Sequence, residues 1–328
     1  MLDHIHSDTL AHLLTAVNTN PLSNPSGNNP SWSTLSCGDV VEIQGPPSSG
    51  KTHLLYSLLI NSIIPREYQS TILGGWAKAA VVFDMDGSFD AIRFNQLLLG
   101  RLTHLLSDSH AAQFIARESL QRLHTFRPTS SAQLAATIVH LPKYHATNFP
   151  RVAIGLVAID SISALYWPDR FATEHMRTAL FPTELAKSRP EVALSLHHVL
   201  IALRLLHSTH GNMIVLNNWG IYPIPGTAPE VYKQHLYSSL NPFMTVPSST
   251  FGPAETVHFP NCLPLTCHVT VSPSPSPRFH NDDSIEKARD RHVSRGLNGE
   301  FIGLVRTPKH TAENFVFRVT PNSILVNF

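Results

Sequence analysis

One eight-residue stretch limits the possible folds more than any other part of the chain. It fits the pattern G-x-x-x-x-G-K-[ST] of phosphate-binding loops and consists of Gly45, Pro46, Pro47, Ser48, Ser49, Gly50, Lys51 and Thr52. Glycines let the backbone turn tightly, so that consecutive N–H groups point at phosphate oxygens, and the following helix adds partial positive charge. The lysine of such a loop reaches the β- and γ-phosphates, and the last hydroxyl binds Mg²⁺. We therefore predict an ATP site with Mg²⁺ on Thr52.

Apolar runs alternate with helical patterns on both sides of this loop. The runs predict strands at 40–44, 79–84, 123–126, 152–160 and 213–217, and the helical patterns lie at 51–63, 89–107, 132–141 and 191–207. This order favours an α/β fold with a mostly parallel, twisted sheet and helices on both faces.

The pattern changes after Gly220. Residues 221–260 are rich in proline and serine and residues 272–300 are polar, with short strand-like runs at 265–271, 301–306 and 315–319. Their hairpin spacing predicts antiparallel strands added to the edge of the main sheet. We therefore divide the 328 residues into an N-terminal helix (7–17) and linker that end at residue 36, and an ATP-binding core (37–328) whose last part, 221–328, is an antiparallel extension.

Asp160 ends the most apolar of the predicted strands. A carboxylate at the end of a buried strand is the second Mg²⁺ ligand of phosphate-loop ATP sites. The alternative is an aspartate that only caps the following helix. The phosphate loop upstream favours the metal role, so we assign Mg²⁺ to Thr52 and Asp160.

Three other stretches resemble signatures of the RecA-type recombinases. IDSISALYWPDRF (159–171) is similar to the segment in which an apolar strand runs into Asp-Ser, small residues and an aromatic residue. FDMDGSFD (83–90) resembles a strand that ends in Asp-x-[Glu/Asp], and Asn217-Asn218 lies where these proteins carry a glutamine that senses the γ-phosphate. With the leading SDTLAHLL helix, these features are most similar to the Rad-fifty-one paralogue branch. The resemblance covers about residues 37–220 well.

The resemblance implies a RecA-like core that binds ATP and joins other paralogue subunits in a hetero-oligomer. Such an assembly supports homologous recombination and DNA double-strand-break repair in the nucleus, with DNA contacted through the complex. Only about 36 residues precede the core, too few for the separate helical N-terminal domain of full recombinases. We therefore expect a reduced, accessory subunit.

Two positions depart from the pattern of active recombinases. Asp86 stands where they carry a glutamate that positions the attacking water, and Asn218 stands at the glutamine sensor. Each side chain is one methylene shorter, and hydrolysis in this class depends mainly on positioning. We therefore expect slow or negligible ATP hydrolysis, with weak catalytic roles for both residues.

Two other functions stay open from the sequence. A DNA-stimulated ATPase that acts directly as a recombinase would need Asp86 to hold the water. A small-molecule kinase would need an arginine-rich lid, which we do not find. The net charge is only +1, and the predicted DNA loop at 219–255 contains Lys233 as its single Lys or Arg. DNA binding by this chain alone is therefore not favoured, unless aromatic residues of that loop stack on bases.

Composition argues against several other classes. No apolar run approaches the length of about 18 residues that suggests a membrane span, and no basic leader predicts secretion. Three cysteines are too few for a disulfide framework and fit a reducing compartment. The spacing of Cys262, Cys267 and His268 does not match a zinc site.

Overall fold

A computed structural model describes residues 37–180, 195–220, 263–274, 284–287, 299–308 and 313–327. The predicted helix at 7–17 and its linker lie outside these residues. So does the predicted DNA loop at 219–255, apart from its first two residues.

The α/β fold and the mostly parallel sheet are confirmed. The sheet has nine strands in the order β11-β10-β9-β8-β1-β7-β6-β4-β5. The five strands predicted within 37–220 all form. They lie side by side in the sheet in the order β1-β7-β6-β4-β5, and each pairs parallel with its neighbour. They are β1 (Val40–Gly45), β4 (Ala79–Asp84), β5 (Leu123–Phe126), β6 (Ile154–Asp160) and β7 (Met213–Trp219).

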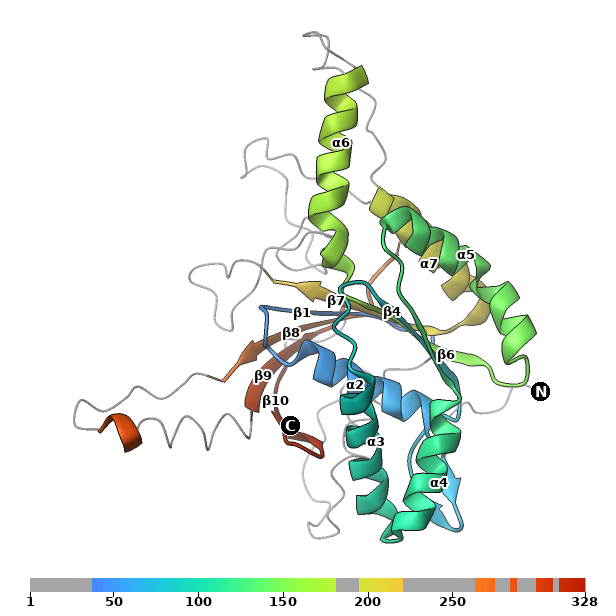
Figure 1. Cartoon of the computed structure of the whole chain (residues 1–328), viewed down its shortest axis with the longest axis vertical. Helices are drawn as coiled ribbons and strands as arrows, with labels where there is room; N and C mark the ends of the chain where they lie inside the picture. The colour runs from blue at the N-terminus through green and yellow to red at the C-terminus, as the bar shows by residue number, and fades with distance from the viewer. Residues whose placement is uncertain are drawn as a thin grey trace.

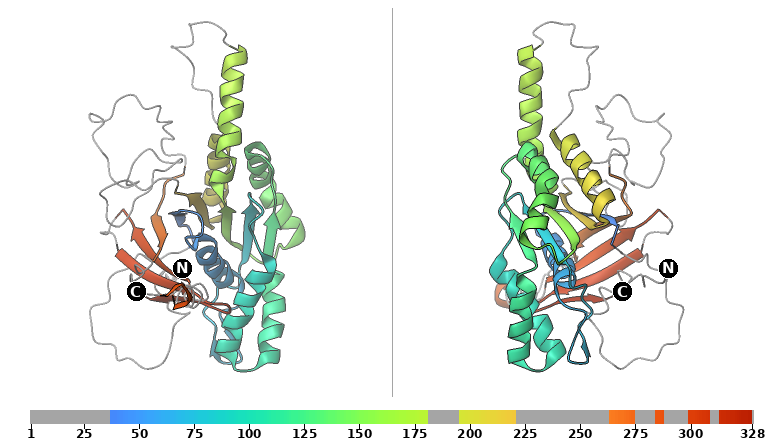
Figure 2. Two further views of the ribbon diagram at one scale, coloured as in Figure 1. Left: turned by 60° about the vertical axis from the view of Figure 1, so that its left-hand side comes forward. Right: turned by 90° about the vertical axis from the view of Figure 1, so that its right-hand side faces the viewer.

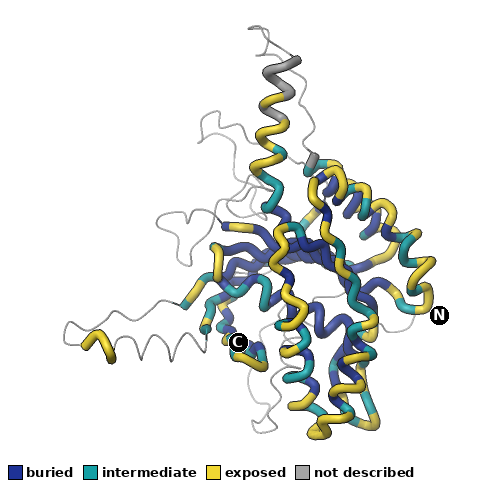
Figure 3. The backbone as a smooth tube through the Cα atoms, in the orientation of Figure 1, coloured by how far each residue is buried: buried dark blue, intermediate teal, exposed yellow. Residues whose placement is uncertain are grey.

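Helices cover both faces of this sheet (Figure 1). One face, which we call the near face, packs against α2 (Lys51–Ile63), α3 (Ala91–Leu106) and α4 (Ser109–Leu120). The far face packs against α5 (Ser131–Asn148) and α7 (Ser195–His210). Side chains alternate along a strand, so Val82 lies in the near core and Val81 in the far core. Both cores appear as continuous burial in the middle of the molecule (Figure 3).

The C-terminal extension is antiparallel from its first strand onward, as predicted, but joins the sheet differently. It consists of β8 (Cys267–Pro273), β9 (Gly299–Arg306), β10 (Glu313–Val319) and β11 (Ile324–Asn327). β8 itself pairs parallel with β1, so β1 is an interior strand. The prediction of purely antiparallel additions is wrong at this point, because hairpin spacing describes how the strands of the extension pair with each other and not how the first one docks.

Two helices were not predicted, and one is longer than predicted. α4 begins after Asp108, whose carboxylate accepts from the His110 backbone N–H at 2.9 Å. α6 (Tyr166–Leu180) follows the short 3₁₀ helix η1 (Ile162–Leu165). α5 continues beyond Pro142, where a proline usually ends a helix, to residue 148.

α6 projects beyond the other helices and strands in every view (Figures 1 and 2). A small hairpin, β2 (Glu67–Tyr68) and β3 (Thr71–Ile72), forms a separate two-stranded sheet. None of the helices in the described ranges combines the length and the apolar character that crossing a membrane requires.

Candidate nucleotide-binding site

The stretch 45–52 lies between a buried strand and a helix. β1 ends at Gly45, and α2 begins at Lys51 after Gly50, whose φ of 85° favours glycine. A Cβ on Gly45 would lie 2.2 Å from the carbonyl oxygen of Val271, and one on Gly50 would lie 2.8 Å from the ring of Phe317. The backbone of this loop is therefore closely packed against β8 and β10, and both glycines are required by the space around them.

Lys51 points back into the loop. Its Nζ donates to the carbonyl oxygens of Gly45 at 2.9 Å and Pro46 at 2.7 Å. Only 7% of the residue is exposed. Burial lowers its pKa to about 8, while the negative charges of Asp160 and Asp86 act in the opposite direction. The loop thus holds a buried amine next to the backbone N–H groups that open α2.

Thr52 and Asp160 meet directly, although they are far apart in the sequence. The Thr52 hydroxyl donates to Oδ2 of Asp160 at 3.0 Å. The other carboxylate oxygen, Oδ1, accepts from Nδ2 of Asn217 at 2.9 Å. Burial raises the pKa of Asp160, and the two hydrogen bonds oppose that rise. A hydroxyl and a carboxylate side by side are the hard oxygen ligands that Mg²⁺ prefers.

Among the buried polar atoms that have no hydrogen-bond partner in the described structure are Oγ of Ser49, in the loop, and Oδ1 of Asn217, beside Asp160. A buried polar atom costs free energy unless something binds it. Phosphate oxygens would satisfy the hydroxyl, and the water shell of a cation would satisfy the amide oxygen. The residues present therefore fit a nucleotide with Mg²⁺ held by Thr52 and Asp160.

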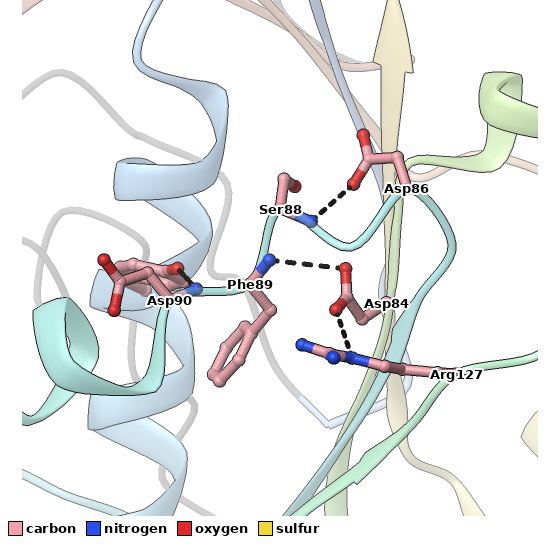
Figure 4. Close-up of polar contacts among 7 residues, drawn as sticks. Asp84, Asp86, Ser88, Phe89, Asp90 and Arg127 are labelled. Atoms are coloured by element: carbon pink, nitrogen blue, oxygen red, sulfur yellow. Dashed lines mark hydrogen bonds and ion pairs between the residues drawn. The ribbon is translucent and has the colours of Figure 1, made fainter.

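Asp86 lies in the loop after β4 (Figure 4). Its Oδ1 accepts from the backbone N–H of Ser88 at 3.0 Å, and the side chain is exposed. Its charge raises the pKa of both Asp160 and Lys51, which places it beside the same site. Asp86 thus lies within electrostatic range of Asp160 and Lys51, although it hydrogen-bonds to neither residue among the contacts described.

Asp84 has a structural role in the same loop. Its carboxylate accepts from the Phe89 backbone N–H at 3.3 Å and forms an ion pair with Nε of Arg127 at 2.9 Å (Figure 4). Arg127 comes from the end of the neighbouring strand β5. The pair fixes the start of the loop that carries Asp86. From the sequence, Asp84 was included in the Asp-x-[Glu/Asp] signature without being given a role, and Arg127 was not singled out.

Tyr56 fixes the end of that loop. Its hydroxyl, one helical turn after Thr52 on α2, accepts from the backbone N–H of Asp90 at 2.8 Å. The ring packs edge-on against Phe89 and Phe94, with centroids 5.2 and 5.4 Å away. The spacing of four residues from Thr52 is the sequence signal that would have placed Tyr56 on the same face of α2.

Asn218, the predicted sensor, points to the far face. Its Nδ2 donates to Oε1 of the buried Glu42 at 2.7 Å. The sensor position was assigned from the sequence by matching a signature, without following the alternation along β7, so no amide that faces Asp160 was singled out. The adjacent Asn217 is the one that reaches Asp160.

A buried polar network continues from Glu42 across the C-terminal strands. Oε2 of Glu42 lies 3.9 Å from Nε2 of His268. Nη1 of Arg306 lies 3.2 Å from Nδ1 of His268 and 2.7 Å from the Thr270 hydroxyl. A guanidinium can only donate, so Nδ1 of His268 accepts and the ring carries its proton on Nε2, towards Glu42. His268 thus links Arg306 to Glu42 in this network.

Comparison with known proteins adds a direct likeness. No protein-family model matches the chain. The mouse DNA repair protein XRCC2 is 34% identical over 133 residues, which is 40% of this chain and 43% of that protein. The chain is therefore similar to XRCC2 over part of its length. The Arabidopsis thaliana DNA repair protein XRCC2 homolog is 26% identical over a region that covers 47% of this chain and 50% of that homologue. The chain thus spans about half the length of the XRCC2 proteins that it matches, and the likeness agrees with the paralogue branch suggested by the sequence.

Proposed function

We propose that this XRCC2-like chain is an ATP-binding accessory subunit of a recombinase-paralogue complex. The complex acts in homologous recombination and DNA double-strand-break repair in the nucleus, and this subunit hydrolyses ATP slowly or not at all. The contact of 3.0 Å between Thr52 and Asp160, beside the buried Lys51, carries the nucleotide part of the proposal. The similarity to DNA repair proteins named XRCC2 supports the repair part.

The groups that would bind the phosphates and Mg²⁺ already lie together in and beside the loop. The N–H groups at the start of α2 and the Lys51 ammonium bind phosphate oxygens, which replace the carbonyls of Gly45 and Pro46 as acceptors for Nζ. Thr52 and Asp160 hold Mg²⁺, which neutralises phosphate charge when bound. Ser49 contributes a buried hydroxyl that has no partner among the described residues.

The expectation of weak hydrolysis rests on the surroundings of Asp86 and Asn218. Asp86 is exposed and its carboxylate is engaged by the Ser88 backbone N–H. Asn218 is occupied by Glu42 on the other face of the sheet, away from Asp160. Hydrolysis needs a water held in line with the γ-phosphate. Among the contacts described, neither side chain is bonded to Lys51, Thr52 or Asp160, which favours a subunit that uses ATP as a structural ligand.

A test starts from the purified chain, alone and together with candidate paralogue subunits. We expect a fluorescent ATP analogue to bind the wild type, and Lys51→Ala to weaken that binding by at least about tenfold, because a charge-assisted contact is lost. Lys143→Ala, which removes an exposed lysine on α5, serves as the control. Failure of the folded wild type to bind the analogue would contradict the proposal.

Turnover separates the proposed role from that of a stand-alone DNA-stimulated ATPase. ATP hydrolysis is measured with and without single-stranded DNA. The accessory role predicts little turnover in both conditions. Strong stimulation of the isolated chain by DNA would favour the direct recombinase, and transfer of phosphate to a small molecule would favour the kinase.

A further inference from the structure

β7 carries two adjacent asparagines that are both fully buried. They are identical in chemistry and differ only in the face of the sheet to which they point. Met213 and Val215 belong to the near core, and Ile214 and Leu216 belong to the far core. The alternation therefore directs Asn217 to the near face, where α2 lies, and Asn218 to the far face.

Asn217 completes the hydrogen bonding of Asp160. Its Nδ2 donates to Oδ1 at 2.9 Å, while Thr52 donates to Oδ2 at 3.0 Å. With one donor on each oxygen, the plane of the carboxylate is fixed. The amide nitrogen can only donate, so it holds Oδ1 without competing for a cation. Oδ2 is thereby kept towards Thr52.

The second atom of this amide is also informative. Oδ1 of Asn217 is buried without a hydrogen-bond partner in the described structure. It is an acceptor beside the carboxylate, at the carboxyl end of a central parallel strand. In open α/β sheets, ligands bind outside these strand ends. A water molecule bound to a cation at Thr52 and Asp160 would supply the missing donor.

We propose that Asn217 is a positioning residue that orients Asp160 for Mg²⁺-dependent nucleotide binding, a role that Asn218 does not share. The inference rests on the proposed function, since it concerns the same site. Partners that orient a metal ligand typically contribute about ten- to a hundredfold to metal affinity. Loss of Asn217 is therefore expected to remove most of the gain in nucleotide affinity that Mg²⁺ provides.

Asn218 offers a matched control one residue away. It has the same side chain, the same strand and the same complete burial, but its Nδ2 binds Glu42 at 2.7 Å on the far face. Replacing it removes a buried hydrogen bond without touching Asp160. A purely structural effect of losing a buried asparagine should therefore appear in both variants, whereas an effect on Mg²⁺ should appear only at Asn217.

The experiment compares Asn217→Leu with Asn218→Leu in the full chain. Affinity for a fluorescent ATP analogue is measured with Mg²⁺ and with EDTA, and thermal unfolding is followed without nucleotide. We expect the ratio of the two affinities to fall about tenfold or more in Asn217→Leu, with the EDTA value close to wild type. Asn218→Leu should lower the unfolding temperature and keep the ratio.

A second variant covers the case in which leucine at this buried position prevents folding. Asn217→Ser is smaller, and its hydroxyl ends too near the backbone to reach Asp160, so it should reduce the ratio as well. A wild-type ratio in a folded Asn217 variant, or an equal loss in Asn218→Leu, would overturn the inference while nucleotide binding stands. A wild type that binds no nucleotide in either condition would instead overturn the proposed function, and this inference with it.

Discussion

Glu42 is a buried carboxyl group on the strand that leads into the phosphate loop. Burial raises its pKa from 4.5 to about 7, and the hydrogen bond from Asn218 opposes this rise. Asn218 on β7 and His268 on β8 face it, and Arg306 on β9 lies behind His268. The imidazole of His268 is neutral, because burial and the charge of Arg306 lower its pKa to about 3. No full positive charge therefore touches Glu42 among the contacts described.

This carboxyl makes stability depend on pH in a direction unusual for a glutamate. Between pH 4.5 and about 7 the unfolded chain has released a proton that the folded chain retains. The contribution of Glu42 to the free energy of unfolding is therefore fully present below pH 4.5 and is lost as the pH rises through about 7. Through Glu42, the free energy of unfolding falls by roughly 3 kcal/mol between pH 4.5 and about 7, since each pKa unit corresponds to about 1.4 kcal/mol.

Glu42→Gln removes this dependence and keeps an acceptor for Asn218. We expect the variant to gain stability relative to the wild type as the pH rises from 5 to 8, by up to roughly 3 kcal/mol. Urea unfolding at a series of pH values measures the difference in the free energy of unfolding between the variant and the wild type. All other titrating groups are the same in both proteins, so their contributions cancel. Glu67→Gln, at an exposed position, should show no such trend. A difference between Glu42→Gln and wild type that stays constant with pH would contradict the argument.

The strands and helices near the phosphate loop could be predicted well because their signals are local. The helix at 51–63 and the strand at 79–84 have the predicted bounds. α4 was missed, since Ala112, Ile115 and Ala116 form only a weak apolar stripe. The parallel docking of β8 on β1 depends on contacts between residues more than 200 positions apart, which no local pattern contains.

In the candidate site, too, residues marked by a local sequence signal could be predicted, and residues brought together only by the sheet order could not. Lys51, Thr52 and Asp160 could be found because each has a fixed place relative to a strand end. Asn217 could have been found by counting the alternation along β7, which its apolar neighbours already define. Arg127 could not, because its partner Asp84 lies on another strand and only the sheet order brings them together.

Gly45, at the junction of β1 and the loop, provides a test of how closely the elements pack. Its φ is not in the left-handed region, so space alone excludes a side chain. Gly45→Ala should force β1 away from the Val271 carbonyl, cost about 1–3 kcal/mol and weaken nucleotide binding. Gly211→Ala is the control: its φ is +59° and nothing lies within 4 Å of a Cβ there. It should cost about 1–2 kcal/mol and leave nucleotide affinity unchanged. Equal nucleotide affinity in both variants would contradict the close packing of the loop.

At the scale of the whole molecule, the element to consider is α6, which carries large exposed aromatic side chains in the described structure. It projects beyond the rest of the described fold (Figure 2). Trp167 and Phe171 on it are 61% and 70% exposed. The Arg170 guanidinium lies 5.9 Å from the centre of the Trp167 ring. Trp167 and Phe171 are four positions apart and share one side of the helix. An accessory subunit would be expected to have such an aromatic surface covered by another subunit.

The double variant Trp167→Ser/Phe171→Ser tests whether this surface serves the assembly. Because both rings are exposed, their loss should change the stability of the isolated chain by no more than about 0.5 kcal/mol. Capture of a paralogue subunit in co-purification should fall strongly, because buried aromatic residues dominate the affinity of interfaces. Ile72→Ser, which removes a side chain that is 76% exposed on β3, controls for a general loss of apolar surface. Undiminished capture by the double variant, or an equal loss with Ile72→Ser, would show that α6 has no special part in binding a partner, and the contact would then have to be sought on another surface of the chain.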